Sequence, residues 1–505
     1  MPQRDSFAQV HVDVRTGAPF TAVPADDTPF CLAVLGDFGG REGTGRPASA
    51  SGPLLVDRDD LDAVLARVAP EVALDLGGPQ RLRFAALEDF HPDRLYERLP
   101  LFAALRETRS RLADPRTFAD AAAALQAPPP AADAGRRAAT VERLATGSLL
   151  DDILAATPGP AAEAAPGTRG GGASAADELA GFLRDVVRPH LVPRPDPRQQ
   201  ELLASVDAAA AALLRVVLHH PAVRALERRW RGVELLVRRL ETGPSLRIAL
   251  FDVTRAELAA GLGRDPRDGA LVRRLAAGAA ALPQSAGWTA MVGLYDLDGE
   301  PADVALLDGL AQLGEACGAP WLGAAPRTLV PTLDADDADD ADDATAPAGA
   351  GAEATAQLWT AVRRAPYARW LGLAHPAVLL RLPYGADGEP VDAPGFEEME
   401  PGLDAPARAH RAAAASRRRR RRQLRPGAHL EVERLPLHLH RHAGGVDAVP
   451  PNGRLLGERD AVRLLEAGVM PLLARREGDS VRLARLQSVA EPVAALAGRW
   501  AAASA

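Results

Sequence analysis

Hydrophobic positions recur with two spacings along the chain, and together they predict a mixed α/β fold. An unbroken apolar run at 30–35 predicts a buried strand, whereas apolar residues spaced three and four apart at 59–68 predict an amphipathic helix. The same criteria predict further elements: strands at 81–84, 246–253, 288–295 and 321–325, and helices at 93–112, 198–218, 221–240 and 301–317. We therefore expect helices packed against a sheet.

Composition divides the chain into three parts. Residues 1–125 have the pattern of one compact unit. Residues 126–176 are rich in Ala, Gly and Pro and cannot fill a core, so we expect a flexible linker that holds one short helix at 147–156. Residues 177–505 form a second and larger region. Two biased segments interrupt it, an acidic loop at 334–343 and an Arg-rich stretch at 400–422.

Charge and residue usage exclude several classes of protein. The 505 residues are 47% hydrophobic, which is ordinary for a globular protein, and the net charge of −8 argues against nucleic acid as a partner. All 59 basic residues are Arg, so Schiff-base, P-loop and kinase lysine chemistry is excluded. Cys31 and Cys317 cannot form a disulfide framework or a Cys-rich zinc site. With no signal-like apolar segment at the N-terminus and no run of 18 apolar residues, we expect a cytoplasmic protein without membrane insertion.

Short motifs that suggest enzymes have simpler interpretations here. Asp37-Phe38-Gly39 spells a kinase magnesium motif, but the chain has no His-Arg-Asp catalytic loop. The Gly-rich loop at 36–45 matches no nucleotide-binding spacing and is best explained as a turn-rich loop. His438, His440 and His442 share one strand face and could bind zinc, although a solvated strand face is the favoured interpretation. We therefore predict no catalytic residue, cofactor or metal, and a protein that is not an enzyme.

Four strings in the second region resemble the large subunit of the type VI secretion contractile sheath, called TssC or VipB. The first and longest is LHHPAVRALERRWRGVELLV at 218–237. The others follow in the family's order: PADVALLDGLAQLGEACGAPWLGAAP at 301–326, YARWLGLAHPAVLLRLPYG at 367–385, and GVMPL with RLQS within 464–488. The residues of these strings taken as the family signature are Trp230, Arg231, Gly232, Arg381, Pro383 and Tyr384.

The N-terminal unit resembles the small sheath subunit, called TssB or VipA. The matching strings are PFCLAVLGDFGGRE at 29–42, VDRDDL at 56–61 and LEDFHP at 87–92. In the family the two subunits are separate chains, whereas here one chain carries both, the small subunit first.

This resemblance implies contractile phage-tail-sheath-like domains and a structural polymer. It implies that copies of the chain stack in helical layers around an inner tube of Hcp, attach to baseplate components, and contract to drive the tube into a target cell. It also implies recycling by ClpV, an AAA+ unfoldase. An alternative is a degenerate or regulatory sheath paralogue that does not polymerise, and an unrelated metal or nucleotide enzyme is a third and weaker hypothesis.

Two segments are candidate interaction sites. Ser148, Leu149, Leu150, Ile153 and Leu154 can form a capped amphipathic helix, which in this family is the position of the unfoldase recognition helix; a helix that merely packs on the protomer is the alternative. Val10, Val12 and Val14 alternate as in a strand and are candidates for pairing with the sheet of a neighbouring protomer.

The stretch at 400–422 departs from the family pattern. Family members carry a Trp-containing helix between the string at 396–398 and the string at 424–427, whereas this chain has no aromatic residue there and six consecutive Arg at 417–422. A compensated pair of frameshifts in a GC-rich gene is the simplest hypothesis. A basic loop facing an acidic surface of the tube and an inert insertion are the alternatives, and reading the gene in its other frames distinguishes them.

Overall fold

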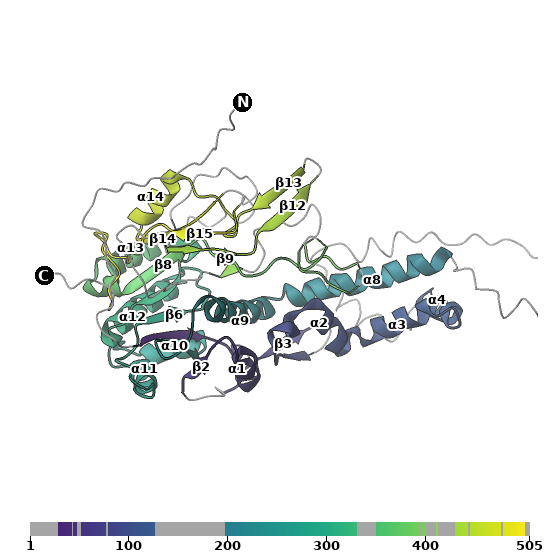
Figure 1. The fold of residues 1–505 in the computed structure, drawn as a ribbon, viewed down its shortest axis with the longest axis horizontal. Helices are drawn as coiled ribbons and strands as arrows, with labels where there is room; N and C mark the ends of the chain where they lie inside the picture. Colours follow the sequence, from purple (N-terminus) through teal and green to yellow (C-terminus); the bar gives the residue numbers. More distant parts are fainter. Residues whose placement is uncertain are drawn as a thin grey trace, which may run out of the picture. The chain divides into compact units, whose positions relative to one another are not determined.

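The protein was analysed as a computed structural model (Figure 1), which describes residues 29–42, 44–47, 52–76, 79–126, 197–330, 350–386, 388–393, 395–399, 411–412, 430–442, 445–475 and 478–499. Several predicted features therefore lie outside the described residues. These are the candidate strand with Val10, Val12 and Val14, the predicted helix at 147–156 with Ser148, Leu149, Leu150, Ile153 and Leu154, the acidic loop at 334–343, and all of 400–422 except Arg411–Ala412.

The described strands are β1 Phe30–Gly36, β2 Leu54–Val56, β3 Glu71–Asp75, β4 Pro79–Arg83, β5 Leu246–Asp252, β6 Ala290–Gly293, β7 Trp321–Ala324, β8 Leu371–His375, β9 Val378–Leu379, β10 Arg411–Ala412, β11 Leu430–Val432, β12 His438–His442, β13 Gly445–Val449, β14 Val469–Ala474 and β15 Val481–Leu483. The described α-helices are α1 Leu61–Val68, α2 Pro92–Arg98, α3 Ala103–Ala113, α4 Phe118–Gln126, α8 Pro197–Leu218, α9 Pro221–Arg239, α10 Arg255–Leu262, α11 Ala270–Ala280, α12 Pro301–Cys317, α13 Ala350–Arg364 and α14 Glu458–Glu466.

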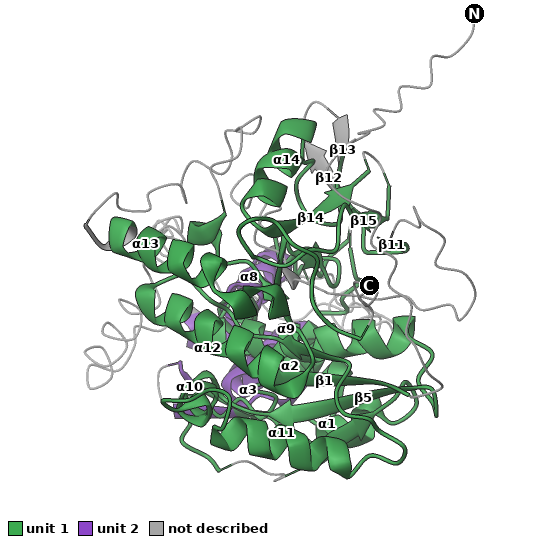
Figure 2. Ribbon diagram, turned by 90° about the vertical axis from the view of Figure 1, so that its left-hand side faces the viewer, with its two compact units in different colours: residues 1–73, 82–95, 214–505 green, residues 74–81, 96–213 purple. Residues whose placement is uncertain are grey.

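Two compact units divide the chain (Figure 2). Unit 1 comprises residues 1–73, 82–95 and 214–505, and unit 2 comprises residues 74–81 and 96–213. Each unit therefore draws on both the N-terminal region and the region after the predicted linker.

The centre of unit 1 is a nine-stranded sheet with the order β11-β15-β14-β8-β7-β6-β1-β5-β2. Its interior strands, from β14 to β5, run parallel, and the strands at both ends are antiparallel to their neighbours. Three further pairs, β3 with β4, β9 with β10, and β12 with β13, form two-stranded sheets. The mixed α/β fold that the hydrophobic pattern predicts is thus confirmed.

Strand β1 lies inside this sheet although it comes from the first 40 residues. It pairs in parallel with β5 on one side, where Phe30 is opposite Leu246 and Gly36 is opposite Asp252, and with β6 on the other. Its side chains are buried from Cys31 to Leu35. Parallel strands buried on both faces read as continuous apolar runs, which is why the sequence of β1 shows no alternation.

Helices cover the sheet with an apolar core. One large buried cluster joins alternate residues of β1 to apolar residues of α10, α11, α12, α13 and α14. The intervening residues Leu32 and Val34 are also buried, so the sheet is covered on both faces. Within this core Trp288 donates its indole N–H to the carbonyl of Leu275 at 2.8 Å, which satisfies its only polar group.

The predicted elements that fall on described residues are confirmed with one exception. The predicted single helix over 93–112 is wrong, because the chain forms α2, then a 3-10 turn at Pro100–Phe102, and then α3. Pro100 has no backbone N–H to donate and disfavours helical geometry in the residue before it, so one continuous helix cannot pass through it.

Unit 2 packs helices from two distant parts of the chain. Leu112 and Ala121, from α3 and α4, share a small core with Val206 of α8. Arg109 of α3 contacts the Asp207 carboxylate at 2.7 Å, and the Gln199 amide donates to the Leu112 carbonyl at 2.7 Å.

Among the described residues, no single helix has both the length and the apolarity to cross a bilayer. Helices α8 and α9 reach that threshold only when they are taken together, and they are bent by 67° at the break between them.

Candidate functional site

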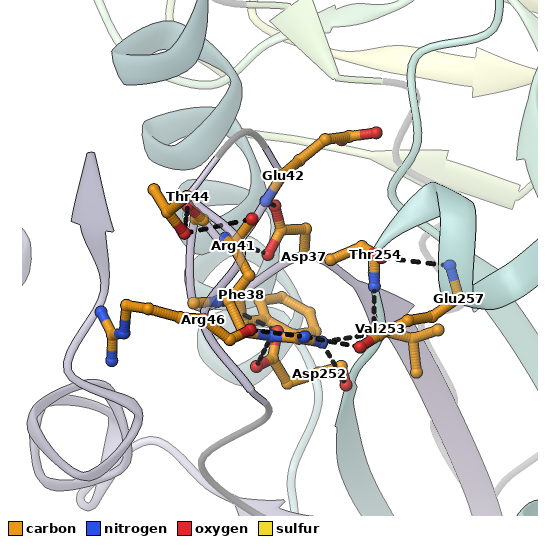
Figure 3. A network of polar contacts seen from close by, with 12 residues as sticks. Asp37, Phe38, Arg41, Glu42, Thr44, Arg46, Asp252, Val253, Thr254 and Glu257 are labelled. Atoms are coloured by element: carbon orange, nitrogen blue, oxygen red, sulfur yellow. Dashed lines mark hydrogen bonds and ion pairs between the residues drawn. The ribbon is translucent and has the colours of Figure 1, made fainter. Parts of the chain in front are cut away.

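A cluster of charged side chains forms where strands β1 and β5 end (Figure 3). Because the strands are parallel, the loop after β1 and the start of α10 meet at the same edge of the sheet. The Nε of Arg41 lies 2.9 Å from Asp252 Oδ2, and its two terminal nitrogens lie 2.6 and 2.5 Å from the oxygens of Glu257. The side chains of Arg41 and Asp252 are 2% and 1% exposed, so water is excluded from their contact, whereas the Glu257 side chain is 44% exposed; we call these three residues the Arg41 cluster.

The loop that presents Arg41 is shaped by its own polar contacts. The Asp37 carboxylate accepts hydrogen bonds from the backbone N–H groups of Arg41 at 2.7 Å and Glu42 at 2.8 Å. Gly40 has φ +64°, and a Cβ there would lie 2.6 Å from the Glu71 carbonyl oxygen, so only Gly fits. The kinase-like letters Asp37-Phe38-Gly39 therefore encode a turn that fixes Arg41.

Glu257 has two structural roles in the cluster. Its carboxylate accepts the N–H of Thr254, whose hydroxyl in turn accepts the N–H of Glu257, and this capping box starts α10. The hydrogen bond from Arg41 lowers the pKa of Glu257 to about 2. Burial has the opposite effect on its neighbour and raises the pKa of Asp252, although the Gly39 N–H and Arg41 both oppose that shift.

Glu257 is expected to make folding stability depend on acid pH. Its contribution is fully present above its ordinary pKa of 4.5 and is lost as pH falls towards 2, whereas the raised pKa of Asp252 favours folding at low pH. Glu257→Gln removes only the first effect, so the unfolding midpoint of this variant should fall less between pH 5 and pH 3 than that of the wild type. Urea unfolding at both pH values measures this. Glu315→Gln, at an exposed ion pair, is the control. If the unfolding midpoint falls by the same amount between pH 5 and pH 3 in Glu257→Gln and the wild type, the lowered pKa of Glu257 does not contribute to stability.

The predicted signature residue Trp230 connects α9 to the loop after β1. Its indole N–H donates to the Phe38 carbonyl at 3.0 Å, and the two rings meet edge to face with centroids 5.4 Å apart. Trp230 is fully buried. Gly232, two residues later, faces Leu294 in the chain segment after β6.

The remaining signature residues meet in a second buried cluster, which we call the Arg381 cluster. Arg381 bridges two carboxylates, with its Nε 2.7 Å from Glu227 of α9 and its Nη1 2.7 Å from Glu398. Its guanidinium also lies over the ring of Tyr384, 3.9 Å from the centroid. Arg231 donates to the Tyr384 hydroxyl at 3.3 Å.

Electrostatics in the Arg381 cluster favour the charged guanidinium. Burial alone would lower the pKa of Arg381, but the carboxylates of Glu227 and Glu398 raise it well above its ordinary value. Burial raises the pKa of the Tyr384 phenol, so Tyr384 is a neutral hydrogen-bonding group. Pro383, the sixth signature residue, is buried, and its carbonyl accepts the N–H of Glu389 at 2.9 Å.

The loop that contains Glu398 also contacts the N-terminal region. The His91 ring meets Tyr384 edge to face at 4.9 Å, and the Asp93 carboxylate accepts the N–H groups of Asp392 and Ala393 at 3.0 and 2.8 Å. The loop is therefore held by contacts with the N-terminal region and with the Arg381 cluster as far as Glu398, shortly before the Arg-rich stretch at 400–422. Within 400–422 the structure describes only β10, which pairs with β9.

The structure separates the signature residues into two places. Arg231, Arg381, Pro383 and Tyr384 come together, whereas Trp230 and Gly232 lie along α9 towards β6 and the loop after β1. Sequence reasoning missed the partners Arg41, Asp252, Glu257, Glu227 and Glu398. The available signal was a charged residue next to an apolar run, as in FDVTRAE at 251–257, but nothing in the sequence pairs it with Arg41.

The three alternating histidines do lie on one strand, β12, which pairs with β13. Side chains are described for His438 but not for His440 or His442. Within the part of the chain that the structure describes, no three His, Cys, Asp or Glu side chains are grouped so as to hold a metal ion.

These contacts make the two parts of the chain interdependent, because the N-terminal part completes the sheet and its Arg41 neutralises the buried carboxylate of Asp252 in the C-terminal part. The comparisons identify both parts. Residues 200–490 match the family described as EvpB/VC_A0108, tail sheath N-terminal domain, and residues 9–127 match the family described as type VI secretion system, VipA, VC_A0107 or Hcp2. The chain therefore belongs to the VipB tail sheath family and carries a VipA segment in front, as a TssB–TssC fusion.

A relative supports the same assignment. The type VI secretion system sheath protein TssC1 of Pseudomonas aeruginosa is 29% identical over 315 residues, which cover 58% of this chain and 61% of the relative. The chain thus spans about three fifths of the length of this curated relative.

Proposed function

We propose that this chain is a sheath protomer that polymerises around an Hcp tube and contracts to drive the tube into a target cell. The observation that carries the proposal is the position of β1 between β5 and β6, because it joins the VipA-type and VipB-type segments in one mixed sheet. Identical copies can then assemble through heterologous contacts into an open helix. In this role the protein is cytoplasmic, attaches to baseplate components and is not an enzyme.

Electron microscopy of the purified full-length chain tests the polymer. We expect hollow cylinders, and Hcp added during assembly should fill them. Discrete particles under all assembly conditions, with or without Hcp, would instead support the alternative of a sheath paralogue that does not polymerise. Val10, Val12 and Val14 are proposed to pair with the sheet of a neighbouring protomer, so Val12→Pro should reduce cylinder formation without changing the fold of single copies.

The two parts should remain associated after the chain between them is cut. A protease site placed within 127–146 leaves β1 hydrogen-bonded on both edges to strands from the C-terminal part, and such a strand cannot leave without breaking the sheet. We expect the cleaved fragments to co-elute in gel filtration at the position of the intact chain. Fragments that elute separately in native buffer would contradict the pairing.

Recycling by a ClpV-like unfoldase is proposed to use the helix with Ser148, Leu149, Leu150, Ile153 and Leu154. Its support is the sequence pattern, an apolar stripe behind a Ser cap. The double variant Leu150→Asp/Ile153→Asp should abolish binding to the unfoldase in a pull-down while cylinders still form. Thr157→Asp, which adds one charge just beyond the stripe, is the matched control. Unchanged binding by the double variant would exclude this segment as the recognition site.

A further inference from the structure

We infer that Arg41 determines which VipA-type segment a VipB-type region accepts, because it supplies the cation for the buried carboxylate of Asp252 and also pairs with the adjacent, half-exposed Glu257. This inference concerns the pairing of the two parts and does not depend on polymerisation. Its basis is that the cation and the two anions come from different family segments, 9–127 and 200–490.

The VipB-type region offers little of its own to neutralise Asp252. Arg274 reaches the backbone carbonyl of Asp252 at 3.4 Å rather than its carboxylate. The carboxylate is instead bound by Arg41 and by the Gly39 N–H at 3.0 Å, both from the loop after β1. Asp252 is 3% exposed, so water does not replace these partners.

The guanidinium matches the site in shape as well as charge. Arg41 makes a bidentate contact with the Glu257 carboxylate through its two terminal nitrogens. Its Nε donates to the Asp252 carboxylate, and a terminal nitrogen donates to the Asp252 backbone carbonyl at 3.3 Å. The backbone N–H of Arg41 donates to Asp37 of its own segment, so this contact in the loop that presents the guanidinium does not depend on the C-terminal part. A segment with a neutral or acidic residue here would bury one carboxylate without a cation and leave a second without its partner.

Physical chemistry predicts that such a cluster gives selectivity more than affinity. Replacing a whole buried ion group by uncharged residues often changes the stability very little. Removing only one partner is strongly destabilising, because the other charge stays buried without compensation. Discrimination by an uncompensated charge is a general device for rejecting wrong partners. The VipB-type region would therefore recognise a segment that carries an Arg at the position of Arg41, four residues after the Asp that follows strand β1.

The test uses the full-length chain with a protease site within 127–146, cleaved after purification. Dissociation of the two fragments is followed by gel filtration in a urea concentration at which the wild type separates over hours. Arg41→Met should dissociate more than tenfold faster, on the order of 100-fold. For the triple variant Arg41→Met/Asp252→Asn/Glu257→Gln, the logarithm of the dissociation rate should return most of the way from the Arg41→Met value to the wild-type value. Arg273→Met, at an exposed ion pair, is the control and should match the wild type.

Two results would overturn the inference. One is a dissociation rate for Arg41→Met that is less than tenfold above the wild-type rate. The other is a triple variant whose logarithmic rate returns less than half of the way to the wild-type value, which would mean that the ions stabilise the pair without discriminating between segments. If Arg41→Met yields no folded chain, the readout is the yield of uncut folded protein, which the triple variant must restore. Neither measurement requires cylinders, so its failure is distinguishable from failure of the sheath proposal.

Discussion

Arg381→Met should lower the free energy of unfolding by about 3–5 kcal/mol, because it removes the guanidinium that bridges the buried carboxylates of Glu227 and Glu398. Methionine keeps much of the aliphatic length of Arg, so the loss reports charge and hydrogen bonding more than volume. The shift of the urea midpoint with the slope held constant measures it.

A matched control for Arg381→Met exists at the surface. Arg267 pairs with Glu315 at 2.7 Å, but both side chains are substantially exposed, so Arg267→Met should change the free energy of unfolding by no more than about 1 kcal/mol. Equal midpoints for Arg381→Met and the wild type would show that the Arg381 cluster contributes nothing net to folding.

Trp230→Ala is the second substitution with a large expected effect, a loss of about 3–5 kcal/mol in the free energy of unfolding. The side chain is fully buried, and its removal leaves a cavity and deprives the Phe38 carbonyl of its indole donor. Trp230→Phe keeps most of the volume and removes the donor, so it should show a smaller loss.

Thermal and urea unfolding of the Trp230 variants should rank them as wild type, then Phe, then Ala. Leu358→Ala, at a side chain that is 46% exposed, serves as the control and should stay near the wild type. If Trp230→Ala unfolds at the wild-type midpoint, α9 does not depend on its contact with the loop after β1.

Local structure was largely predictable from the sequence, and the reason is physical. Strand β1, helix α12 and the start of α9 each carry their own signal, respectively an apolar run, a regular helical spacing, and a Pro at the first helical position. The neighbours of β1 carry no such signal. Its pairing with β5 joins residues more than 200 positions apart, and several other parallel strands in the chain have the same apolar character.

The candidate site shows the same limit. Arg231, Arg381 and Tyr384 were identified through resemblance, yet their buried partners Glu227 and Glu398 look in sequence like solvated surface charges. Only burial separates a structural Glu from an ordinary one, and burial is a tertiary property. Arg41 was hidden for a further reason, because the loop that presents it spells letters associated with kinases.

The placement of β1 also bears on how the protein is made. During synthesis β1 is made more than 200 residues before β5, and β6 follows β5. At roughly 5–20 residues per second, the interval between β1 and β5 lasts about 10 to 40 s. Throughout that interval two long apolar strand edges are unprotected, a hazard for aggregation. Separate subunits would prolong the exposure until a partner chain arrives by diffusion. Joining the two in one chain makes completion of the sheet a first-order event, independent of protein concentration, and fixes the ratio of the two parts at one to one.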